Sequence, residues 1–200
     1  AVTTITGNAA EINTAYASSG ISGLGNEAIN VSSGSASTSQ ANTLAASTSG
    51  PVTATISDGD MATLAGLTET GNAYTITITD NSVAESALNN LDGKTNVAIN
   101  AANINTLTGS AADLNTAYAS SGISGLGNEA VTLSDTTLAA SVLNTLDGNT
   151  SGTINASAVT TITGTATDLI TAYTSSGISG LGNEAVTLSD TTLAASVLNT

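Results

Sequence analysis

The chain has 200 residues and a net charge of −14, with one lysine and no arginine, histidine or cysteine. This balance excludes nucleic-acid binding, which needs basic side chains to neutralise phosphates, and it disfavours contact with anionic membranes. Only 8% of the residues are charged and 2% are aromatic, so the core must be built from small and aliphatic side chains, which suit thin, regular layers. The sequence contains no apolar run of transmembrane length and shows no signal-peptide pattern at its start.

The sequence is repetitive along nearly its whole length. Ser120–Thr145 recurs letter for letter as Ser175–Thr200. A triplet with an apolar residue between two small polar residues also recurs, and in the second half it ends in turn at Thr108, Ser134, Thr163 and Ser189. Shorter and longer steps alternate in this series and form a 55-residue double repeat that is clearest in residues 99–200. We therefore expect residues 1–200 to form a single repeat array that is a window on a longer protein.

Strands and helices are expected in alternation, beginning with a strand that contains the triplet Thr4–Thr6. The helix after it opens with Asn8 and Glu11, which have the spacing of a capping box. Residues 30–50 are the least regular part of the array and include a Ser-rich run, which we expect to form a looser coil or a surface loop. In the run Tyr74–Thr79, Ile76 and Ile78 alternate with threonines, which predicts a strand with one buried and one exposed face.

Helices are also predicted in the second half of the chain. Ser110 with Asp113 and Thr165 with Asp168 repeat the capping-box pattern. Asp135 is expected to cap a helix that follows it directly.

These elements predict an α/β fold. The expected architecture is a right-handed solenoid of about eight strand–helix coils of about 26 residues each, with one parallel sheet and a helical opposite face. In this arrangement the first and third residues of the triplets form an outward ladder of hydroxyl groups. Its members are Thr4, Thr6, Thr55, Ser57, Thr77, Thr79, Thr106, Thr108, Thr132, Ser134, Thr161, Thr163, Thr187 and Ser189.

The ladder has two interpretations. On a single flat sheet it would form a regular grid of hydroxyl and methyl groups, a geometry that resembles ice-binding solenoids and would also suit a polysaccharide. Alternatively, threonine is simply a good residue for an exposed strand face.

The aspartates that close strands also have two interpretations. Oxygen ligands in clusters suit calcium, and Asp58 and Asp80 are the pair expected on neighbouring coils, so they are the candidate metal ligands. The alternation of Gly109, Asp135 and Gly164 at this position favours helix caps over ligands. No other cofactor is expected. Without histidine, cysteine or arginine the chain offers no catalytic set, so we expect no enzymatic activity.

The segment Ile162–Asp190 resembles repeats of very large secreted surface proteins of marine picocyanobacteria, some of which are associated with swimming or adhesion. The resemblance implies a non-catalytic structural segment of an extracellular or cell-surface protein, such as a stalk, fibre or adhesin shaft. Its expected partners are further repeats of the same chain, other copies in a filament, or cell-surface polysaccharide, with no nucleic acid and no membrane insertion. The acidic composition agrees with a high-salt exterior.

Overall fold

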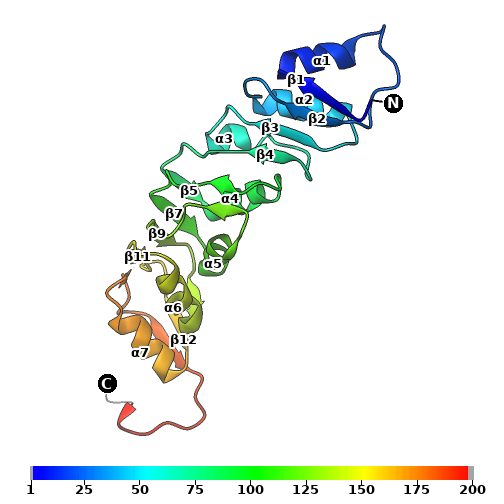
Figure 1. Cartoon of the computed structure of the whole chain (residues 1–200). Coiled ribbons are helices and arrows are strands. Elements are labelled where there is room, and N and C mark those ends of the chain that lie inside the picture. The colour runs from blue at the N-terminus through cyan, green and yellow to red at the C-terminus, as the bar shows by residue number, and fades with distance from the viewer. Residues whose placement is uncertain (1, 198–200) are drawn as a thin grey trace. The chain divides into compact units, whose positions relative to one another are not determined.

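The computed structural model describes residues 2–197 as an α/β fold with parallel sheets (Figure 1). Seven helices occur in the described part of the chain. They are α1 (Ala9–Ala17), α2 (Thr38–Ser47), α3 (Met61–Leu64), α4 (Glu85–Asp92), α5 (Ala111–Ala119), α6 (Ala140–Asn149) and α7 (Ala166–Thr174).

The described residues group into two compact units. Unit 1 contains the residues up to Asp80 together with Ala87–Asn103 and Ser121–Gly125, and unit 2 contains Asn81–Ser86, Ile104–Ser120 and the residues from Leu126 onward. The expectation of a single repeat array stays a prediction.

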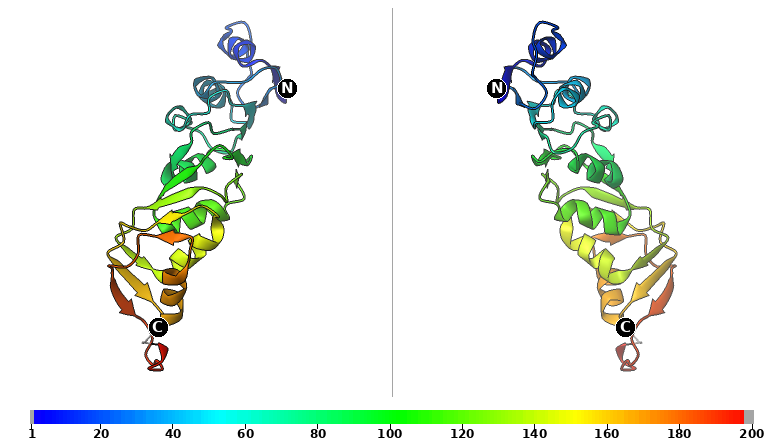
Figure 2. Two further views of the ribbon diagram at one scale, coloured as in Figure 1. Left: turned by 90° about the vertical axis from the view of Figure 1, so that its left-hand side faces the viewer. Right: turned by 90° about the vertical axis from the view of Figure 1, so that its right-hand side faces the viewer.

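Unit 1 contains two parallel sheets. The larger has the order β1-β2-β3-β4, and the smaller pairs β6 with β8. Their strands are β1 (Thr4–Gly7), β2 (Ala28–Val31), β3 (Val52–Thr55), β4 (Ala73–Thr75), β6 (Ile99–Asn100) and β8 (Ile123–Ser124). Helices α1 and α2 pack side by side next to the larger sheet (Figures 1 and 2).

Unit 2 also contains two parallel sheets, with the orders β13-β11-β9-β7-β5 and β10-β12-β14. Their strands are β5 (Ser82–Ala84), β7 (Thr106–Gly109), β9 (Ala130–Leu133), β10 (Thr137–Ala139), β11 (Ile154–Asn155), β12 (Thr161–Gly164), β13 (Ile178–Ser179) and β14 (Ala185–Leu188). Helices α5, α6 and α7 stack in sequence order (Figure 2).

The expectation of one parallel sheet is wrong, because the described strands form four sheets. The reason is the register of the backbone hydrogen bonds. Thr106 pairs with Ala130, and not with Thr132, its counterpart in the next triplet. Thr161 pairs with Thr137, which lies after the preceding triplet. In the shorter step, β7 leads directly into α5. In the longer step, the additional strand β10 lies between β9 and α6 and starts a second sheet, which accommodates the extra residues.

The alternation of buried and exposed side chains predicted for Tyr74–Thr79 is confirmed, although the strand β4 covers only Ala73–Thr75. Ile76 and Ile78 are fully buried, whereas Thr75, Thr77 and Thr79 are exposed. The core consists of Ala, Val, Ile and Leu from strands and helices, with Tyr74 as its largest fully buried side chain. The Ser-rich run is ordered: Ser37 and Gln40 form a capping box at the start of α2.

The hydroxyl of Tyr74 is buried without a hydrogen-bond partner, and burial raises the pKa of this tyrosine to about 12. Removing an unpaired buried polar group relieves its desolvation cost, so we expect Tyr74→Phe to raise the free energy of unfolding by about 1 kcal/mol. The matched control is Tyr118→Phe, because the Tyr118 hydroxyl donates to the Glu129 carboxylate at 2.9 Å. The free energy of unfolding of this control should fall by about 1.5–3 kcal/mol. Urea unfolding of both variants measures the difference, and a destabilised Tyr74→Phe chain would contradict the prediction.

Candidate functional site

The predicted hydroxyl ladder is not carried by a single sheet. Its members on named strands belong to three sheets: those on β1 and β3, those on β7 and β9, and those on β12 and β14. Four members, Thr106, Thr108, Thr161 and Thr163, are half-buried, and the others are exposed. The exposed members are Thr4, Thr6, Thr55, Ser57, Thr77, Thr79, Thr132, Ser134, Thr187 and Ser189.

The register also breaks the ladder into short runs. Thr108 pairs with Thr132, but the next partner of Thr132 is Asn155, and Thr6 pairs with Asn30. The single flat grid that motivated the ice or polysaccharide hypothesis is therefore not formed. Binding of either ligand stays a prediction without that geometric support.

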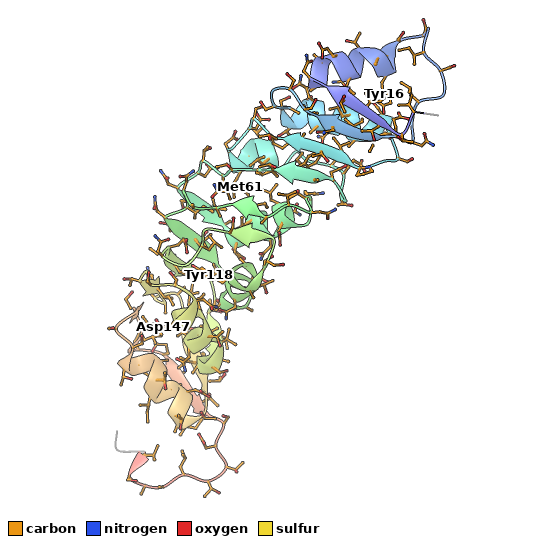
Figure 3. All side chains as sticks on the ribbon, in the orientation of Figure 1. Tyr16, Met61, Tyr118 and Asp147 are labelled. Carbon is orange, nitrogen blue, oxygen red and sulfur yellow. The ribbon has the colours of Figure 1, made fainter. Side chains whose placement is uncertain are left out.

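Asp58 and Asp80, the candidate metal ligands, each accept a hydrogen bond from a helix N-terminus. The Oδ2 atom of Asp58 accepts from the N–H of Thr38 at 2.7 Å, at the start of α2. The Oδ2 atom of Asp80 accepts from the N–H of Met61 at 2.6 Å, at the start of α3. Met61 is labelled in Figure 3. In both cases the helix precedes the aspartate in the chain and belongs to the previous repeat.

Asp135 and Asp190 make the same contact in unit 2. Asp135 accepts from the N–H of Ala111 at the start of α5 (2.8 Å), and Asp190 accepts from the N–H of Ala166 at the start of α7 (2.7 Å). A negative charge at this position is stabilised by the free N–H groups and by the helix dipole. The expectation that Asp135 caps the helix after it is wrong, because α6 begins after Ala139, which makes no side-chain cap.

The alternation of aspartate with glycine follows from the helix that each residue faces. Gly109 faces Glu85, the first residue of α4, and a Cβ atom on this glycine would overlap the Glu85 carboxylate. Gly164 faces Ala140, the first residue of α6. A Cβ atom added to Gly164 would lie only 3.1 Å from the Cβ atom of Ala140. A strand therefore closes with aspartate where it caps the preceding helix, and with glycine where the first side chain of that helix needs the space.

The capping pairs within single helices are confirmed. Asn8 and Glu11 form a complete capping box at α1. Ser110 and Thr165 accept the backbone N–H groups of Asp113 and Asp168 at the starts of α5 and α7. The N-termini of α5 and α7 are thus held both by their own cap and by an aspartate of the next repeat.

Within the described residues, no three acidic side chains gather closely enough to hold a metal ion. The carboxylates of Asp58 and Asp80 contact the backbone of two different helices. Calcium binding at these two residues stays a prediction.

Glutamates in the Gly-Leu-Gly-Asn-Glu loops form a second recurring contact. The Glu129 side chain is fully buried and accepts from the hydroxyl of Tyr118 at 2.9 Å. The N–H groups of Gly127 and Asn128 donate to the same carboxylate, at 2.9 and 3.2 Å. Burying a carboxylate is costly unless hydrogen bonds replace its water, and these three donors do so.

The next repeat closes over this glutamate. Thr150 donates its hydroxyl to the backbone carbonyl of Glu129 at 2.8 Å. A Cβ atom on Gly152 would overlap the same carbonyl oxygen, so only glycine fits there. Thr48 and Gly50 make the same contacts with Glu27 in unit 1.

Tyr16 and Glu27 form the equivalent pair in unit 1, where the Tyr16 hydroxyl donates to the glutamate (Figure 3). This hydrogen bond, together with the N–H groups of Gly25 and Asn26, lowers the pKa of Glu27 below its usual value. Burial, and then the same carboxylate, raise the pKa of Tyr16 to about 12. The pair is therefore a neutral phenol donating to an ionised carboxylate at physiological pH.

A third recurring contact links helix ends. The Ser175 hydroxyl donates to Asp147 Oδ2 at 2.7 Å, so a residue after α7 is tied to the end of α6. Gly177 lies against the same carboxylate, and a Cβ atom on this glycine would overlap Oδ1. Asn115 on α5 donates its amide to the carbonyl of Val142 on α6 at 3.1 Å. Polar side chains thus connect successive repeats at both ends and along the faces of the helices.

The structural role of these glutamates was not predicted from the sequence. A signal was present: the pairs Tyr16–Glu27, Tyr118–Glu129 and Tyr173–Glu184 all have the same spacing in the sequence. The only lysine, Lys94, donates to the carbonyl of Thr68 at 3.2 Å.

The polar side chains described above thus make hydrogen bonds within and between successive repeats.

Comparison of the chain with protein-family models, with curated proteins and with solved structures found no significant match. Of the helices that the structure describes, none combines the length and apolarity needed to cross a bilayer.

The hydrogen bond between Asp135 and the start of α5 predicts which helix is destabilised when this aspartate is substituted. Asp135→Ala should cost about 1 kcal/mol of stability, the usual loss for a helix cap. Because the carboxylate contacts α5, hydrogen exchange at the amide of Ala111 should accelerate while the amides at the start of α6 are unchanged. Asp135→Asn keeps an acceptor oxygen and should show a smaller effect. Faster exchange confined to α6 would contradict this assignment.

The tyrosine–glutamate pair predicts a loss of stability in acid. The pKa of this carboxyl is lower in the folded chain than in the unfolded chain. Its ionised form therefore stabilises the fold fully at pH values above the unfolded-state pKa, and this stabilisation is lost as the pH falls through the folded-state pKa. Urea unfolding of the native chain should therefore show declining stability from about pH 5 downward, and Glu27→Gln should decline less steeply because residue 27 no longer titrates. Equal slopes for the two chains would show that Glu27 does not contribute.

Proposed function

We propose that the chain is a non-catalytic structural segment of a large extracellular or cell-surface repeat protein, such as a stalk, fibre or adhesin shaft. In this proposal the strands and helices form a right-handed α/β solenoid of about eight coils. The observation that carries it is the use of the acidic side chains. In repeat after repeat, they accept hydrogen bonds from backbone or hydroxyl groups of the chain itself.

The recurrence of these contacts supports a repeat architecture. Asp135 and Asp190 are equivalent positions of the double repeat and make the same contact with α5 and α7. Tyr118–Glu129 and Tyr173–Glu184 are likewise equivalent pairs and bond in the same way. Solenoids derive stability from such nearest-neighbour contacts, which can be added without redesigning a central core.

The extracellular location is supported by composition and by the resemblance of Ile162–Asp190 to secreted surface proteins of marine picocyanobacteria. A net charge of −14 with one basic residue keeps such a chain soluble where salt screens its self-repulsion. The absence of cysteine means that the proposed segment needs no oxidising compartment to fold.

A seamless deletion tests the repeat architecture. Removing residues 121–175 joins Ser120 to Ser176 and leaves the local sequence unchanged, because Ser120–Thr145 and Ser175–Thr200 are identical. The shortened chain should fold cooperatively with a native-like circular dichroism spectrum per residue. The control deletion of residues 121–163 removes a non-integral number of repeats and should unfold. Loss of structure in the seamless variant would contradict the proposal.

Location is tested by antibodies raised against the chain. They should label intact picocyanobacterial cells that carry these repeats, without permeabilisation. Labelling that requires permeabilised cells would place the protein inside and overturn the extracellular role.

A further inference from the structure

The strands of unit 2 pair at a nearly constant separation along the chain. Thr137 pairs with Thr161, and Thr161 pairs with Ala185, so each of these coils takes 24 residues. The pairing of Thr132 with Asn155 spans 23 residues. The aspartate contacts at the starts of α5 and α7 also span 24 residues. The hydrogen-bonded coil of this unit is therefore about 24 residues long.

The sequence repeat does not match this coil. The double repeat has 55 residues and exceeds two coils of 24 residues by seven. Equivalent residues therefore do not stack on one another. Thr187 is the counterpart of Thr132 in the next double repeat. Two successive pairings lead from Thr187 through Thr163 to Ala139, which lies seven residues after Thr132 in the chain.

The seven additional residues move each strand and its helix from one sheet to the other. β7 and its counterpart β12 have nearly the same sequence, but β7 belongs to the five-stranded sheet and β12 to the three-stranded sheet. β9 and its counterpart β14 are divided in the same way. Helix α5 follows β7 directly, and its counterpart α7 follows β12 directly. The helices thus advance around the coil from one double repeat to the next.

This advance has a mechanical consequence, because strands and helices need different amounts of room. Neighbouring strands of a sheet are about 4.8 Å apart, whereas packed helices are about 8–10 Å apart. A stack of coils that keeps its helices on one side therefore bends toward its sheet, as curved solenoids do. Helices α5, α6 and α7 pack on one another in unit 2, so the same mismatch acts here. Where the helices advance around the coil, the direction of bending turns with them.

We propose that the seven additional residues of each double repeat are a device that keeps a long array straight. Seven residues of a 24-residue coil turn the direction of bending by between a quarter and a third of a full circle. The direction therefore returns to its starting side after three to four double repeats, and the bends cancel over that length. The inference rests on the repeat architecture proposed above and extends it to the shape of long arrays.

Paired cysteines test the register in the full chain, which contains no cysteine of its own. Paired residues of neighbouring strands are within disulfide reach, because their Cα atoms are about 5 Å apart. Thr132→Cys with Asn155→Cys, and Thr137→Cys with Thr161→Cys, should each form a disulfide within one chain on mild oxidation. The control combines Thr132→Cys with Thr161→Cys, which are counterparts in successive triplets, and should stay reduced.

Mass spectrometry of the oxidised monomers detects each disulfide. Oxidation of the control pair, with the other two pairs reduced, would show that the triplets stack directly. The double repeat would then have no residues in excess of its two coils, and the proposal would be overturned.

A lengthened chain tests the shape. Inserting four further copies of residues 121–175 after Ser175 leaves every junction unchanged, because Ser120–Thr145 and Ser175–Thr200 are identical. Each inserted copy carries a cysteine at the position of Thr132, labelled with a small gold cluster. In electron micrographs the particle should be straight, and the label should move around it by between a quarter and a third of a circle per copy. The unlabelled chain is the control and should have the same straight outline.

Gold clusters aligned along one edge, or a particle that curves into an arc, would overturn the proposal. Both results leave the proposed structural role standing if the seamless deletion folds. A lengthened chain that does not unfold cooperatively would instead contradict the repeat architecture itself, so the two proposals fail separately.

Discussion

The hydrogen bond from a helix N-terminus to the aspartate of the following repeat is the contact on which the arrangement of the repeats depends. Asp135 reaches α5 and Asp190 reaches α7, so a strand and the helix of the previous repeat are fixed together. The free N–H groups of a helix start need acceptors, and a carboxylate supplies one with a favourable charge. Its consequence is that the starts of α2, α3, α5 and α7 are completed by a residue of the following repeat.

The buried glutamates extend the same principle to the loops. Glu129 is enclosed by Tyr118, by its own loop N–H groups and by Thr150 of the next repeat. Tyr118 and the loop N–H groups donate to the Glu129 carboxylate, whereas Thr150 donates to its backbone carbonyl. A buried carboxylate that lost the tyrosine or the loop donors would be destabilising, so the loop conformation and the helix position are coupled through it. Small side chains and glycines are needed beside these groups, as at Gly152. This explains how a chain with few aromatic residues specifies a regular packing.

The same dependence on a neighbour is seen in the apolar side chains. Val131 and Leu133 are buried, whereas the equivalent Val186 and Leu188, which no described strand follows in their sheet, are exposed. The apolar surface of a repeat is therefore covered by the repeat beside it.

The sequence alone determined the α/β class, the strand faces and the caps within helices, because these depend on local periodicity and on residues three positions apart. Asn8 with Glu11 and the buried Ile76 and Ile78 are examples. Only the tertiary structure decided the register and the number of sheets, because the backbone pairing of Thr106 with Ala130 does not follow the spacing of the sequence triplets. For the same reason the role of Asp135 was assigned to the wrong helix: its partner, Ala111, is near it only after the repeats stack.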